Sequence, residues 1–188
     1  MHSVRLLSVA VLTAGLLAGG VGCGSDAKRI DPQGTQTITT TGDIDIQDWQ
    51  DAATRLSQSL LESGTLGSGG EPSIIATSLN KFVNNTTQHV DRDLLIKRIR
   101  IVLNKSGKAK AMKMTEEMKK KAFLEDSDLP EPDYEMELKI IEKTARAGRT
   151  RQSAFVFQMS LLDPKTGILE WEDSTTIAKQ GTRPAVGW

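Results

Sequence analysis

The 188-residue chain is poor in cysteine and aromatic residues, and each shortage excludes a class of protein. One cysteine, Cys23, rules out an intramolecular disulfide and a multi-cysteine zinc site. Aromatic side chains make up 4% of the residues, too few for the stacking platforms that bind single-stranded nucleic acid. The 24 basic residues equal the 24 acidic ones, whereas nucleic-acid-binding domains are normally clearly basic. We therefore expect no nucleic-acid partner.

Signatures of catalysis are missing as well. The sequence contains neither a Gly-x-Ser-x-Gly nucleophile elbow nor a phosphate-binding Gly-x-x-x-x-Gly-Lys loop. His89 stands two residues before Asp91, so a hydrolase that uses His89 and a nearby acid is a third hypothesis, against a surface histidine at a helix start. The acidic run at residues 125–128 lacks the spacing of an EF-hand, which favours a solvated loop over a calcium site. We expect no enzyme, no cofactor and no metal.

The N-terminus has the pattern of a secretory signal. Arg5 precedes an apolar run at residues 6–17, which is shorter than a membrane span, and small residues follow at 18–22. Val21-Gly22-Cys23 resembles the end of a lipobox, the cleavage motif of bacterial lipoproteins, although Gly20 stands where a leucine-like residue is usual. The alternative is an ordinary signal peptide with an incidental cysteine.

A lipoprotein signal would make Cys23 the first mature residue and the site of acylation. More than one acyl chain attaches a protein stably to a membrane. Gly24 follows the cysteine in place of the aspartate that resembles an inner-membrane retention signal, so we expect the outer membrane, facing the periplasm. Residues 24–41 are rich in polar residues and glycine, which predicts a flexible tether that extends to at most about 60–65 Å.

Three helices are predicted in the remaining chain. Apolar residues recur at helical spacing over residues 49–61, behind Asp48 as the expected N-cap. Asp91 is the expected cap of a second helix, which ends near Gly107. Thr115 is the expected cap of a third helix, which is rich in lysine.

Strands are predicted where apolar and polar residues alternate. The side of residues 155–161 that contains every second residue from Phe155 is expected to be buried. Residues 163–167, with proline and glycine, form the expected turn to the last strand. The predicted strands are residues 73–78, 108–114, 134–140, 155–161, and 168 to about 179.

These elements predict a single α+β domain over residues 43–182. An antiparallel or mixed sheet of about four or five strands would pack against three or more helices. The domain follows a signal peptide at residues 1–22 and the tether at 23–42, and a tail at 183–188 ends the chain.

Two features are candidate partner contacts. Arg146, Arg149 and Arg151 surround Gly148 at an expected hairpin tip and form a small basic spot. Trp188 is either an exposed interface residue or packed onto the domain. The lysine-rich stretch at residues 105–121 could face anionic lipid or glycan, with a solvated helix face as the alternative.

Several short stretches, in order along residues 41–182, resemble the LpoB family, the outer-membrane lipoprotein activators of penicillin-binding proteins. The most specific of them leads from an Asn-x-Thr motif into the second expected helix. The stretches are Thr41-Gly42-Asp43-Ile44-Asp45, Ser59-Leu60-Leu61, Pro72-Ser73-Ile74-Ile75, Asn84-Asn85-Thr86-Thr87-Gln88-His89-Val90-Asp91, Ile99-Arg100, Lys105-Ser106-Gly107-Lys108, Asp133-Tyr134, Phe157-Gln158-Met159-Ser160-Leu161, Asp163, Thr166-Gly167, Glu170-Trp171 and Ile177-Ala178-Lys179.

The resemblance implies a fold related to that of the curli-secretion lipoprotein and a non-catalytic, monomeric regulator. Such a protein binds a class A penicillin-binding protein, a bifunctional peptidoglycan synthase, and raises its activity. The expected tether is shorter than is usual in the family, so direct activation requires a partner that extends far toward the outer membrane. The alternative function is a structural or assembly lipoprotein of the broader curli-secretion-like group, acting in envelope assembly or secretion.

Overall fold

The computed structural model describes residues 29–32, 34, 40, 42–124 and 129–182. Cys23, Trp188 and the acidic run at residues 125–128 lie outside the described residues. The predicted signal peptide and tail therefore stay predictions, as does the tether, of which only residues 29–32, 34, 40 and 42 are described.

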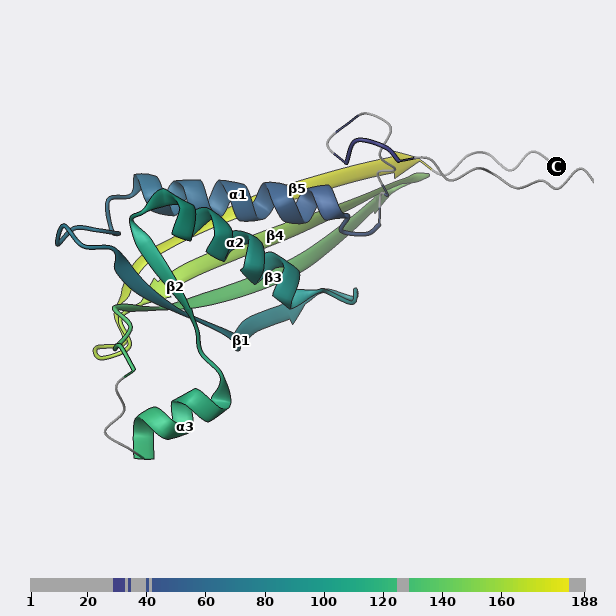
Figure 1. Cartoon of the computed structure of the whole chain (residues 1–188). Coiled ribbons are helices and arrows are strands. Elements are labelled where there is room, and N and C mark those ends of the chain that lie inside the picture. Colours follow the sequence, from purple (N-terminus) through teal and green to yellow (C-terminus); the bar gives the residue numbers. More distant parts are fainter. Residues whose placement is uncertain (1–28, 33, 35–39, 41, 125–128, 183–188) are drawn as a thin grey trace, which may run out of the picture.

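The described residues form one mixed sheet of five strands with three helices (Figure 1). The strand order is β2-β1-β3-β4-β5, in which β1 runs parallel to β2 and β3, and β3, β4 and β5 are antiparallel. This arrangement confirms the predicted single α+β domain. The elements are α1 (Ile46–Glu62), β1 (Ser73–Asn85), α2 (Arg92–Ser106), β2 (Ala109–Lys113), α3 (Glu116–Leu124), β3 (Tyr134–Ala147), β4 (Thr150–Leu162) and β5 (Leu169–Thr182).

Helix α1 begins earlier than its sequence pattern predicts. The N-cap is Asp45, whose Oδ1 accepts hydrogen bonds from the backbone N–H groups of Gln47 (3.0 Å) and Asp48 (3.1 Å). Asp48 completes a capping box, since its Oδ2 accepts from the backbone N–H of Asp45 at 2.8 Å. The prediction of Asp48 as the cap is wrong because a capping box places a second acid three residues after the first.

The caps of α2 and α3 are as predicted. The Asp91 carboxylate accepts from the backbone N–H of Leu94 at 3.1 Å, and Gly107 ends α2 with a left-handed φ of 72°. Thr115 Oγ1 accepts from the backbone N–H of Met118 at 3.2 Å. Leu94 of α2 is 40% exposed, because the helix buries the row that contains Leu95 and Ile99.

Strand β1 is longer than the predicted strand of residues 73–78. Its pairing with β3 shifts register between Thr77 and Phe82, so a bulge interrupts the alternation of apolar and polar residues. Polar Asn84 and Asn85 then pair with β3 at the end of the strand. The sequence pattern therefore stops before the hydrogen-bonded strand does.

The core lies between the sheet and the pair α1 and α2, which cover one face (Figure 1). The β3–β4 register aligns Leu138 with Met159 and Ile140 with Phe157, so alternate residues of both strands face the helices. Trp49 of α1 packs edge-to-face on Phe157, with ring centroids 5.7 Å apart. The predicted buried side of residues 155–161 is confirmed. Its members Phe155, Phe157, Met159 and Leu161 are each at most 1% exposed.

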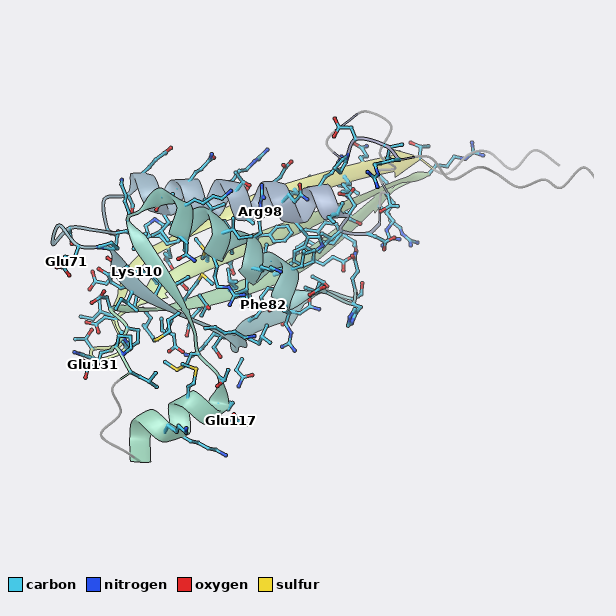
Figure 2. All side chains as sticks on the ribbon, viewed as in Figure 1. Glu71, Phe82, Arg98, Lys110, Glu117 and Glu131 are labelled. Atoms are coloured by element: carbon cyan, nitrogen blue, oxygen red, sulfur yellow. The ribbon has the colours of Figure 1, made fainter. Side chains whose placement is uncertain are left out.

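The opposite face of the sheet carries neither α1 nor α2. Phe82 of β1 belongs to the core, whereas Arg98 lies exposed on α2 (Figure 2). Helix α3 stands apart from the sheet (Figure 1) and is tied to β1 by Asn80 Nδ2, which donates to Glu116 Oε1 at 2.8 Å. One face of the sheet therefore packs into the core. The other face, which includes Lys81, Glu137, Lys139 and Gln158, is available for other contacts, and we call it the helix-free face.

Replacing Phe157 with alanine should destabilise the domain by about 3–5 kcal/mol, because the change leaves a cavity beneath Trp49. Urea unfolding followed by tryptophan fluorescence measures this. Val83 is 47% exposed, and Val83→Ala serves as the control, with an expected loss of about 1 kcal/mol or less. Equal losses in the two variants would contradict the assignment of the core to the helix-covered face.

Candidate docking surfaces

The predicted basic spot is the tip of the β3–β4 hairpin. Gly148, with φ of 58°, makes the turn, and Arg146 pairs directly with Arg151 across the two strands. Arg149 lies in the turn between the strands, and all three arginines are exposed. We call Arg146, Arg149 and Arg151 the basic tip. The hairpin is confirmed, while a role in binding a partner stays a prediction.

The positive charge of the basic tip is not neutralised by the described residues. None of the ion pairs found among them includes Arg146, Arg149 or Arg151. The nearest acid along β3, Glu142, accepts hydrogen bonds from the backbone N–H (3.0 Å) and Oγ1 (2.8 Å) of Thr87 instead. Like charges directly opposite each other destabilise a strand pair. The Arg146–Arg151 pair therefore lowers the stability of the hairpin and does not help the domain to fold.

The chain enters the domain at this same end. Gln88 fixes the entering segment, because its Nε2 donates to the backbone O of Gly42 and its Oε1 accepts from the backbone N–H of Ile44, both at 2.7 Å. The Arg151 guanidinium lies beside Gly42. Further upstream, the backbone O of Pro32 accepts from Gln47 Nε2 in the first turn of α1. The N-terminal segment is thus held close to the basic tip.

Lys179 of β5 forms a buried ion cluster with the start of α1. Its Nζ donates to Asp45 Oδ2 at 2.8 Å, to the backbone O of Asp43 at 2.9 Å, and to Asp48 Oδ2. Lys179 is 8% exposed. Burial opposes its charge, but the hydrogen bonds to Asp45 and Asp48 hold the pKa of Lys179 above its ordinary value. These contacts join the last strand, the first helix and the entering segment.

The helix-free face presents charged and polar side chains. Lys81 bridges Glu135 (3.3 Å) and Glu137 (2.9 Å), and the hydrogen bond to Glu137 raises the pKa of Lys81. A shallow groove of about 520 Å³ lies beside this bridge. Its lining includes Asn80, Lys139, Gln158, Ser160, Glu172 and Ser174.

The end opposite the basic tip is acidic. Glu131, labelled there in Figure 2, pairs with Lys165 at 2.6 Å, and Asp133 Oδ2 accepts from the backbone N–H of Ile74 at 2.7 Å. Burial first, and then the nearby carboxylates, raise the pKa of Tyr134. The predicted turn at residues 163–167 is confirmed and lies at this end, with Gly167 at φ of 74°. The long axis of the domain therefore runs from the basic tip to these acidic loops.

The structure places the remaining candidates away from any reactive cluster. His89 is exposed in the loop between β1 and α2, and the Asp91 carboxylate caps α2. The lysine-rich stretch at residues 105–121 runs from the end of α2 through β2 into α3, so its charges are spread over three elements. The described residues contain no group of three or more side chains that could hold a metal ion.

Sequence patterns missed the Lys179 cluster and the groove on the helix-free face. A lysine at an inward-facing position of a strand, in step with Ile177, was the available signal, because lysine is almost never fully buried without a partner. Asp45, one of the two acids that pair with Lys179, lies 134 residues before it along the chain, and Asp48 lies slightly closer. No local pattern identifies such a pair.

These features define a small two-layer α+β domain with an exposed basic tip and an exposed helix-free face. In the described part of the chain, no helix has the length and apolar content needed to span a membrane. The family model described as "Peptidoglycan-synthase activator LpoB" matches residues 48–177. The chain belongs to this family.

Solved structures with a similar fold are only distantly related in sequence. The LpoB C-terminal domain from Salmonella enterica is 17% identical, with 69% of this chain and 98% of that chain covered and a TM-score of 0.47. The Escherichia coli domain is 16% identical at the same coverage, with a TM-score of 0.46. Lipoprotein GNA1162 from Neisseria meningitidis is 13% identical, with 58% and 84% covered and a TM-score of 0.43. No curated protein sequence matches the chain.

Removing the Lys179 ammonium should destabilise the domain strongly. Lys179→Met leaves the Asp45 and Asp48 carboxylates without their cation, and breaking a buried ion pair costs about 3–5 kcal/mol. Chemical unfolding at neutral pH measures the loss. Lys139→Met, on the exposed helix-free face, should change stability by about 0.5 kcal/mol or less.

The effect of Lys179→Met should also depend on pH. Burial opposes ionisation of Asp45, but the hydrogen bonds from Lys179 and from α1 hold its pKa below the ordinary value of 3.8. The stabilisation is therefore complete above that value and is lost as the pH falls through the lowered pKa. The raised pKa of Lys179 keeps its contribution intact up to the ordinary value of 10.5. A difference between wild type and variant that stays constant below about pH 4 would contradict the ion cluster.

Proposed function

We propose that this protein is a lipid-anchored, non-catalytic activator of a peptidoglycan synthase and that its partner is a class A penicillin-binding protein. The observation that carries the proposal is membership of the peptidoglycan-synthase activator family, because the match over residues 48–177 includes most of α1 and nearly all of the sheet. The exposed polar surfaces suit a regulator that acts by binding.

The activator works as a monomer at the outer membrane, facing the periplasm. Acyl chains on Cys23 would hold it there, as the lipobox-like end of the N-terminal segment suggests. From Cys23 to Pro32, which Gln47 holds at the start of α1, the chain spans at most about 32 Å, and strands of this length add about 45 Å. Contact with a synthase anchored in the inner membrane then requires that the synthase extend far toward the outer membrane.

Activation follows from differential affinity. A regulator shifts a synthase toward its active conformation only by binding that conformation more tightly than the inactive one. A tenfold shift in the conformational equilibrium requires about 1.4 kcal/mol of difference. Such a difference is small compared with the binding energy that a standard interface provides.

The helix-free face is the docking surface that we propose for the synthase. Five strands present a surface of roughly 20 by 40 Å, on the order of 800 Å². This area matches the share of one partner in a standard protein interface. The groove beside Lys81, lined by Lys139 and Gln158, offers charged and amide groups that can set specificity.

Reversing charge on this face should weaken binding to the synthase. Lys139→Glu combined with Gln158→Glu places two new carboxylates in the middle of the proposed interface, where we expect a loss of about tenfold or more in affinity. Binding of the purified periplasmic part of the synthase to the immobilised protein measures this. The stimulation of glycan polymerisation should fall in parallel.

Arg55→Glu combined with Gln58→Glu is the matched control, since both residues are exposed on α1 and the charge change is the same. This control should bind the synthase as wild type does. Weaker binding by the α1 variant alone would move the docking surface to the helix-covered side. Binding of no penicillin-binding protein at all would contradict the proposed function.

Replacing Cys23 with alanine should abolish lipidation. We expect no incorporation of labelled palmitate and release of the protein from outer-membrane fractions, because no acyl chain remains to anchor it. Metabolic labelling and membrane fractionation provide the measurement. Label that persists in Cys23→Ala would show that the acylated residue is a different one.

A further inference from the structure

We propose that the basic tip binds anionic phospholipid headgroups of the membrane that carries the anchor. This inference rests on the proposed lipid anchor at Cys23, but its chemistry is independent of the synthase. The partner is a lipid surface that contains phosphatidylglycerol, whose phosphate groups match the guanidinium groups of Arg146, Arg149 and Arg151.

The basic tip carries the positive charge that an anionic surface attracts. The basic tip has exposed guanidinium groups that form no ion pair with a described residue, and Arg146 and Arg151 lie directly opposite each other. Lys143 of β3 and Arg29 are exposed and add positive charge near the same end. Basic clusters next to a membrane anchor are typical of segments that bind anionic lipid.

The N-terminal segment enters the domain beside the basic tip. The hydrogen bond from Gln47 to Pro32 holds the N-terminal segment against the first turn of α1. Eight residues lie between Cys23 and Pro32, so this part of the chain spans at most about 32 Å. Gln88 and Lys179 fix residues 42–45 at the same end, so the chain enters the domain at the end that carries the basic tip.

The end opposite the basic tip carries acidic loops. Glu131, Asp133, Asp163 and Glu170 gather there, with Lys165 paired to Glu131. An anionic surface attracts the basic tip and repels these acidic loops, so both effects turn the domain the same way. The strands then stand upright on the membrane, and the helix-free face stays accessible from the periplasm.

The expected size of the effect follows from the number of arginines. Each basic side chain near an anionic surface strengthens binding about fivefold, so three contribute on the order of 100-fold. Without acyl chains this attraction is weak but measurable. With the anchor in place, the short chain keeps the tip at a high local concentration near the headgroups.

The test uses the mature chain with Cys23→Ser, which cannot be acylated. Its binding is measured by co-sedimentation with vesicles of phosphatidylethanolamine and phosphatidylglycerol in a three-to-one ratio, and with vesicles in which phosphatidylcholine replaces phosphatidylglycerol. We expect about tenfold or stronger binding to the anionic vesicles, lost when salt is raised. In this background Arg146→Gln, Arg149→Gln and Arg151→Gln together should reduce binding to that of the neutral vesicles.

The control removes the same charge at the far end, through Lys110→Gln, Lys120→Gln and Lys121→Gln, and should change binding less than about twofold. Equal losses in both variants, or no preference for anionic vesicles, would overturn the proposal. So would a tip variant that keeps lipid binding but loses affinity for the soluble synthase, since the arginines would then contact protein. If the protein binds the anionic vesicles but no synthase, the proposed function fails while lipid binding by the basic tip stands.

Discussion

The ammonium group of Lys179 is the constraint that joins the two ends of the folded chain. It reaches from the last strand to the capping box of α1 and to the segment that enters the domain. A buried lysine is tolerated only with partners, and here two carboxylates and a carbonyl provide them. Because α1 begins at this cluster, the helix is set along β4 and β5, and residues 42–45 enter the domain beside the basic tip.

This constraint gives the domain a direction. At one end lie the entering chain, the Lys179 cluster and the basic tip; at the other lie the acidic loops and α3 (Figures 1 and 2). The two helices cover one face of the sheet and leave the other open. A tethered regulator benefits from such a division, because the end nearest the anchor can meet the membrane while a broad face remains open to a synthase. Membership of the activator family gives that open face its proposed partner.

The parts of the fold that sequence alone predicted are those encoded by local patterns. The buried side of residues 155–161, the turn at 163–167 and the cap at Asp91 depend on neighbours within a few residues. The end of β1 was missed because a bulge and its pairing with β3 decide it. Lys179 was missed because its partners are distant along the chain. The arginines were found as a cluster, but only the folded topology places them beside the entering chain.

Binding of a peptidoglycan synthase to the helix-free face can be tested inside cells. Site-specific photo-crosslinking in cells tests it most directly, with a photoreactive residue at Gln158 on that face or at Gln58 on the exposed side of α1. Both positions are exposed, so differences in reactivity report on the partner rather than on burial. We expect an adduct with a class A penicillin-binding protein from position 158 and none from position 58. An adduct from position 58 alone, or from neither position, would contradict it.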